Sequence, residues 1–103
     1  MRIIVTDRAD AKLQETVNYI REEYGGRARQ KFIHEFHFIM KLLMKNPNMG
    51  PAEPLLASRP TLYRSIVMNR QNKIVYRVTD DSIEIVDFWD TRREPKEQAG
   101  YVK

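Results

Sequence analysis

The sequence predicts an α+β fold in which an N-terminal strand and a helical hairpin precede a three-stranded antiparallel meander. A short β-branched run opens the chain, two apolar stripes at helical spacing follow on either side of Gly25-Gly26, and three strand-like segments occupy the second half. The order β-α-α-β-β-β allows both helices to pack on one face of the sheet. A chain of 103 residues can bury one such core, so we expect a single domain over 1–103 with a polar tail at 90–103.

The first predicted strand is RIIVT, residues 2–6, and a helix follows it directly. Thr6 or Asp7 offers a side-chain oxygen that can cap the free N–H groups of this helix. The helix is expected to end at Gly25-Gly26, because glycine readily adopts the left-handed conformation that terminates helices. Its apolar stripe is Leu13, Val17, Ile20 and Tyr24.

The second helix is predicted over about 27–46, and the short glycine link makes the two helices an antiparallel hairpin. Its apolar face is Phe32, Phe36, Ile39, Met40 and Leu43. A proline-rich connection, 47–60, leads to strands predicted at about 61–68, 72–79 and 82–89. Because side chains alternate along a strand, the middle strand is expected to bury Ile74, Tyr76 and Val78 under the helices. Lys73, Val75 and Arg77 then lie on an uncovered face.

Positive charge is concentrated in one part of the chain. The net charge is +4, yet no acidic residue occurs from 54 to 79. The cations of this segment are Arg59, Arg64, Arg70, Lys73 and Arg77. A local excess of this kind favours an anionic partner, although a solvated face whose cations prevent edge-to-edge aggregation is the alternative.

We expect Arg64, Lys73 and Arg77 to converge on the uncovered face, with Arg92 and Arg93 folding over its edge. Guanidinium groups bind phosphate through forked hydrogen bonds as well as charge. The aromatic side chains expected to stack on bases beside these cations are Tyr63, Tyr76 and Trp89. This pattern predicts a surface for nucleic acid or another anionic target, with Arg70 at the turn that precedes the middle strand.

Several functional classes are excluded by what the sequence lacks. There is no cysteine, which excludes disulfides and cysteine-ligated metal and fits a cytoplasmic protein. No apolar run is long enough to span a membrane, and the N-terminus does not resemble a signal peptide. His34 and His37 have no further ligands nearby, so we expect no metal site, and no cofactor-binding motif occurs.

The second half of the chain resembles the RelE/ParE superfamily of toxins, the small basic toxins of bacterial type II toxin–antitoxin modules, also called plasmid stabilisation proteins. The residues that carry the resemblance are Arg64, KIVYRV at 73–78, TDDSIEIV at 79–86 and RREP at 92–95. The family fold has the same β-α-α-β-β-β order. The resemblance therefore implies growth inhibition, a cognate antitoxin as partner, and no cofactor.

One branch of this superfamily, the RelE-like toxins, cleaves messenger RNA on the ribosome without a metal. For this chain that branch implies catalytic roles for Arg64, Lys73 and Arg92, whose charges would stabilise the transition state as the ribose 2′-hydroxyl attacks the phosphate. Two positions depart from the RelE-like pattern. Ile66 stands where a second basic residue is expected, and Gln98 stands near the position of the tail tyrosine, with Tyr101 three residues later.

The other branch, the ParE-like toxins, inhibits DNA gyrase and is not nucleolytic. The turn and strand at 79–86, followed by Arg92-Arg93, match that branch more closely. The sequence therefore favours inhibition of gyrase, with a ribosome-dependent endoribonuclease as the alternative and a non-toxic basic interaction domain as the second alternative. The residues expected to bind the target are Arg64, Arg70, Lys73, Arg77, Arg92 and Arg93.

Overall fold

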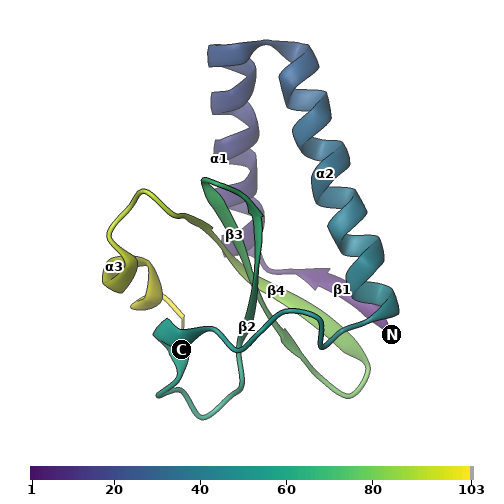
Figure 1. Cartoon of the computed structure of the whole chain (residues 1–103), viewed down its shortest axis with the longest axis vertical. Coiled ribbons are helices and arrows are strands. Elements are labelled where there is room, and N and C mark those ends of the chain that lie inside the picture. Colours follow the sequence, from purple (N-terminus) through teal and green to yellow (C-terminus); the bar gives the residue numbers. More distant parts are fainter. Residues whose placement is uncertain (103) are drawn as a thin grey trace.

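The computed structural model, which describes residues 1–102, confirms the predicted fold class (Figure 1). The elements are β1 (Arg2–Val5), α1 (Asp7–Tyr24), α2 (Gly26–Lys45), the 3-10 turn η1 (Pro54–Leu56), β2 (Arg64–Asn69), β3 (Asn72–Val78), β4 (Ser82–Asp90) and α3 (Pro95–Ala99). The sheet order is β1-β4-β3-β2. The meander is antiparallel as predicted, whereas β1 pairs parallel with β4, so the whole sheet is mixed.

The ends of α1 are set by the residues that the sequence indicated. Thr6 caps the helix by accepting a hydrogen bond from the Ala9 N–H at 3.2 Å, and its hydroxyl donates to the Val86 carbonyl on β4. Gly25 has φ 94°, a conformation that disfavours any residue with a Cβ. The chain can therefore reverse in one residue, and α2 begins at Gly26.

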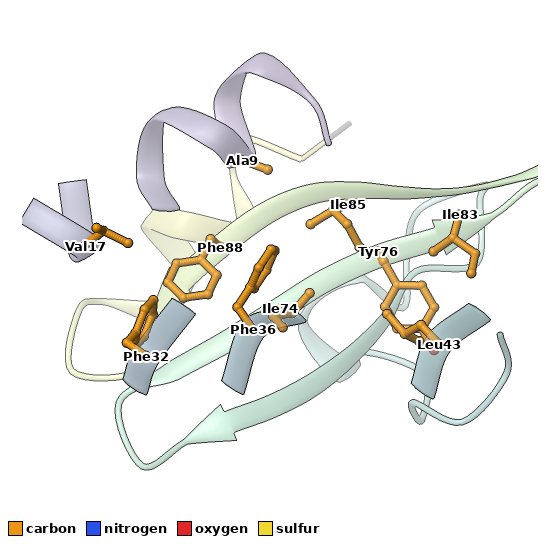
Figure 2. Close-up of a cluster of buried hydrophobic side chains, with 10 residues drawn as sticks. All are labelled: Ala9, Val17, Phe32, Phe36, Leu43, Ile74, Tyr76, Ile83, Ile85 and Phe88. Atoms are coloured by element: carbon orange, nitrogen blue, oxygen red, sulfur yellow. The ribbon is translucent and has the colours of Figure 1, made fainter. Parts of the chain in front are cut away.

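One core fills the space between the helical hairpin and the sheet (Figure 2). The buried residues of this core are Ala9, Val17, Phe32, Phe36, Leu43, Ile74, Tyr76, Ile83, Ile85 and Phe88. The Phe88 ring meets Phe32 and Phe36 edge to face, with centroids 6.0 and 6.4 Å apart. The Tyr76 hydroxyl is satisfied inside this core because it donates to Pro47 O at 2.8 Å and accepts from Gly50 N.

The assignment of Tyr24 to the buried stripe of α1 is wrong. Its side chain is 69% exposed, whereas Val17, two turns earlier, is buried. The hairpin projects beyond the sheet, so the last turn of α1 finds no partner in the core (Figure 1). Helical spacing identifies a stripe but not the point at which the layer beneath it ends.

The expectation that the second face of the sheet is uncovered is also wrong. A smaller core lies there, formed by Leu56, Tyr63, Val75, Trp89, Ala99 and Val102. It is covered by η1 and by the segment around α3, which lie together on this side. These segments carry isolated apolar residues without a repeating spacing, and periodicity therefore does not reveal them.

Polar contacts hold the C-terminal segment in place. The Gln98 side chain exchanges two hydrogen bonds of 2.9 Å with the backbone of Asp90. The Arg59 guanidinium donates to the carbonyls of Ala99 and Val102 at 2.9 and 3.0 Å. Arg8 lies over the Tyr101 ring at 4.0 Å and also donates to the buried Asp87 carboxylate. The segment is thus joined to the sheet, to η1 and to α1.

Candidate target-binding surface

Lys73 lies on the face away from the helices, as predicted, but its charge is already paired. Its ammonium group donates to the Glu53 carboxylate at 2.8 Å, and Ser65 Oγ donates to the same oxygen. Burial alone would raise the pKa of Glu53, but the hydrogen bonds from Lys73, Ser65 and the Leu55 N–H outweigh it and hold that pKa below its usual value. Lys73 is therefore the partly exposed partner of a buried carboxylate on this face.

Arg77 and Arg64 also have partners within the chain. Arg77 Nε donates to Glu84 on the adjacent strand at 2.6 Å, and this hydrogen bond raises the pKa of the guanidinium. Arg64 pairs across the sheet with Tyr76 and therefore lies on the helix side. Its guanidinium donates to Gly50 O at 2.8 Å and fixes the connection that follows α2. The expectation that Arg64 shares a face with Lys73 and Arg77 is wrong.

The structure brings Arg70, Arg92 and Arg93 together at one end of the sheet. Thr91 N donates to Gln71 O and Thr91 Oγ1 donates to Arg70 O, each at 2.8 Å, so the β2–β3 turn is joined to the segment after β4. Arg92 is held by the Asp90 carboxylate, which accepts from its Nε and Nη2 at 3.1 Å. The side chains of Arg70 and Arg93 are exposed and make no ion pair with any residue of 1–102.

Arg64 and Arg92 lie toward opposite ends of β3. Arg64 pairs with Tyr76, whereas Asp90, next to Arg92 in the chain, pairs with Asn72 four residues away. Four residues of strand span about 13 Å. Lys73 lies between these two positions but points to the other face. The three cations therefore do not surround one phosphate in this conformation.

The predicted stacking role of Tyr63, Tyr76 and Trp89 is wrong, because all three rings are buried. Tyr76 is in the core under the helices, while Tyr63 and Trp89 are in the smaller core on the other face. The Trp89 indole N–H donates to Asp87 at 2.9 Å. None of these rings presents a free face to a base.

Sequence reasoning missed several residues that shape this surface. Glu53 forms an ion pair with Lys73, but its position just before the acid-free segment does not indicate a contact with a residue 20 positions later. Tyr19 and Tyr24 lie at the arginine-bearing end of the sheet and line the same hollow as Arg92 and Arg93. Helical spacing assigns Tyr24 to the apolar stripe and does not single out Tyr19, because their exposure depends on where the sheet ends.

The described residues hold no grouping of histidine, aspartate and glutamate suited to a metal ion. His34 and His37 both point to solvent on α2. No helix within 1–102 is both long and apolar enough to cross a membrane.

The chain was compared with known protein families and with solved structures. The sequence profile described as the ParE toxin of the type II toxin–antitoxin system parDE matches residues 3–95. No curated protein matches the sequence. The structure resembles a chain of the chromosomal ParDE toxin–antitoxin system from P. aeruginosa with a TM-score of 0.70 and 21% identity, over 87% of this chain and 95% of that one.

Two further solved structures share the fold. One is the YoeB dimer from Staphylococcus aureus, with a TM-score of 0.60, 20% identity, and coverage of 86% of this chain and 94% of that one. The other is the E. coli DinJ-YafQ complex, with a TM-score of 0.59, 15% identity, and coverage of 87% and 92%. These likenesses establish the architecture of the chain.

Proposed function

Because the chain belongs to the ParE toxin family of type II toxin–antitoxin systems, we propose that it arrests growth by inhibiting DNA gyrase. It is a toxin with the fold of the RelE/ParE superfamily, as the sequence resemblance predicted. The inhibitory action is assigned to binding and not to cleavage of nucleic acid. The residues proposed to contact the target are the exposed cations Arg70, Arg92 and Arg93 at one end of the sheet.

The separation of the three candidate catalytic cations carries this proposal. Arg64 is on the helix side, Lys73 is paired with Glu53 on the other face, and Arg92 is paired with Asp90 at the far end of β3. In-line attack by a ribose hydroxyl needs cationic groups around one phosphate and a group that moves a proton. Ile66, at the position where a second base is expected, is packed against the core. These features favour a binding mode of action.

A gyrase supercoiling assay with full-length protein from cell-free synthesis tests the proposal. We expect loss of negative supercoiling that depends on toxin concentration, while a ribosome-programmed messenger RNA stays intact. The double variant Arg92→Ala, Arg93→Ala should lose most of the inhibition, whereas Arg21→Ala, an exposed cation on α1, should retain it. Codon-phased messenger RNA cleavage with unaffected gyrase would instead establish the ribosome-dependent nuclease.

A second arm removes Lys73 without leaving a buried charge behind. The double variant Glu53→Gln, Lys73→Met takes away both charges of the ion pair and nearly preserves their volume. Under the binding mechanism it inhibits gyrase as the wild type does. Under the nuclease mechanism it abolishes cleavage of messenger RNA.

We further propose that the chain is held inactive by a cognate antitoxin that covers both exposed cations and exposed apolar side chains. The exposed side chains of Arg70 and Arg93 form no ion pair within residues 1–102, and Phe38 on α2 is 62% exposed. The structures from P. aeruginosa and E. coli are of toxin–antitoxin systems, which supports this expectation. Co-expression with the product of an adjacent small gene should restore growth and yield a complex that copurifies; unrestored growth and separate elution would contradict it.

A further inference from the structure

A hollow at the arginine-bearing end of the sheet has the composition of a ligand site. It has a volume of about 320 Å³ and lies between α1 and the end of β4. A second hollow of about 390 Å³ adjoins it around the β2–β3 turn, since Ile20, Tyr24, Gln71 and Asn72 line both. The first is close in size to the smallest small-molecule pockets of proteins.

Two exposed tyrosine rings form one side of this site. Tyr19 is 44% and Tyr24 is 69% exposed, and their ring centroids are 6.4 Å apart at an interplanar angle of 79°. Aromatic rings left in water on a small protein have apolar faces that a planar ligand can cover. Any nucleobase has such a plane, so stacking tolerates every base.

Cations line the same two hollows. Arg93 lines the first hollow and Arg70 the second, and neither guanidinium has an ion-pair partner among residues 1–102. The Arg92 guanidinium is paired with the Asp90 carboxylate at 3.1 Å and also interacts with the Tyr19 side chain. The cations that line the two hollows are Lys12, Lys31, Arg70, Arg92 and Arg93, against Glu15, Glu35 and Asp90. Five positive and three negative charges leave a net charge of +2.

We propose that this site binds one nucleotide, with the base stacked on Tyr24 or Tyr19 and the phosphates on Arg93 and Arg70. The juxtaposition of exposed tyrosine rings with exposed guanidinium groups matches a ligand that is planar at one end and anionic at the other. The nucleotide is either a free nucleoside phosphate or the end of a single strand, and both present the same chemistry. This inference does not rest on the inhibition of gyrase.

Calorimetric titration of the full chain with three probes tests it: ATP, inorganic tripolyphosphate and a short single-stranded oligothymidylate. We expect ATP or the oligonucleotide to bind at least about tenfold more tightly than tripolyphosphate, because only they offer a base to stack. The tighter of the two identifies the source of the nucleotide. Equal affinity for ATP and tripolyphosphate would overturn the proposal, as would no binding of either nucleotide probe.

Variants separate stacking from charge. Tyr24→Ala should reduce the affinity for the nucleotide to that for tripolyphosphate, whereas Tyr24→Phe keeps the ring and should retain the affinity. Arg70→Ala with Arg93→Ala should weaken binding of nucleotide and tripolyphosphate alike by about tenfold or more. Arg21→Ala removes an equal charge from α1 outside the site and should have little effect. A loss with Arg21→Ala as large as that with Arg93→Ala would reveal non-specific attraction only.

Gyrase inhibition measured on the same variants keeps the two proposals distinct. Nucleotide binding that depends on Tyr24, without inhibition of gyrase, would support this inference and contradict the proposed function. Inhibition of gyrase without nucleotide binding would support the proposed function and contradict this inference.

Discussion

Glu53 shows how one buried carboxylate changes the role of a cation on a strand. The charge of Lys73 suggested a ligand site when considered alone, yet Glu53 is 2% exposed and accepts hydrogen bonds from Lys73, Ser65 and the Leu55 N–H. A charge removed from water needs such partners. Lys73 therefore compensates an internal charge of the same chain, and removal of Lys73 would leave the Glu53 carboxylate buried without its cation.

Removal of Lys73 from the ion pair with Glu53 should destabilise the fold. Lys73→Met leaves the buried carboxylate without its cation and should lower the free energy of unfolding by about 2 kcal/mol at neutral pH. The loss should be much smaller in the background of Glu53→Gln, which a double-mutant cycle measured by urea denaturation will show.

The sign of the pH effect follows from the lowered pKa of Glu53. A carboxyl whose pKa is lower in the folded state than in the unfolded state stabilises the fold above its ordinary value of 4.5 and loses that contribution as pH falls through the folded-state pKa. The difference between wild type and Glu53→Gln should therefore shrink below pH 4.5. A difference that grows with acidity would contradict the assignment.

Gly50 is a second residue whose environment fixes its identity. A Cβ at this position would lie 2.8 Å from both Ser65 O and the Tyr76 hydroxyl. Gly50→Ala should therefore cost about 1–3 kcal/mol of unfolding free energy and displace the hydrogen bond to Tyr76. Gly26→Ala is the matched control, because a Cβ there meets nothing within 4 Å, and its thermal midpoint should not fall.

At the scale of elements, the C-terminal segment acts as a cover for the second face of the sheet. Its helix α3 has only five residues and cannot be stable alone. Ala99 and Val102 pack beside Trp89. Hydrogen bonds from the Arg59 and Gln98 side chains fix the backbone of the segment against the sheet and η1. The cover therefore depends on a few side-chain contacts between this segment and the rest of the chain.

Arg59→Ala should loosen this cover. The variant loses the hydrogen bonds to Ala99 O and Val102 O, and we expect a loss of about 2 kcal/mol in unfolding free energy. Trp89 fluorescence should shift to longer wavelength as water reaches the smaller core. Arg70→Ala, which removes an exposed side chain, should change stability by no more than about 0.5 kcal/mol; an equal loss in both variants would argue against a role for Arg59 in the cover.

The sequence predicted the elements well where a period was present. The spacing of Phe32, Phe36 and Leu43 identified the buried face of α2, and alternation along 72–78 placed Ile74 and Tyr76 under the helices. It failed where burial comes from segments without a period, as for Val75 and Trp89 beneath η1 and α3. Ion-pair partners such as Glu53 and Lys73 depend on the course of the 47–60 connection, which no local pattern encodes.

At the scale of the whole molecule, the sheet is the middle layer between two cores of different size. Strands β3 and β4 contribute to both, since Ile74 and Phe88 face the helices while Val75 and Trp89 face the other side. The two cores share the backbone of these strands, so we expect them to be lost together.

Unfolding should therefore be a single cooperative transition. Trp89 fluorescence reports the smaller core and far-ultraviolet circular dichroism reports mainly α1 and α2, so their thermal midpoints should coincide. An earlier fluorescence transition would show that the C-terminal cover melts before the helical layer.

The parallel partnership of β1 with β4 has a consequence for how the toxin comes into being. The first strand of the chain has its neighbour some eighty positions later, Arg2 opposite Ser82. The ribosome must synthesise β4 before β1 can pair with it. Pairing between segments so far apart in the chain slows folding to the native state. We therefore expect the complete sheet, and with it the surface formed at its end, to appear only after β4 has been synthesised.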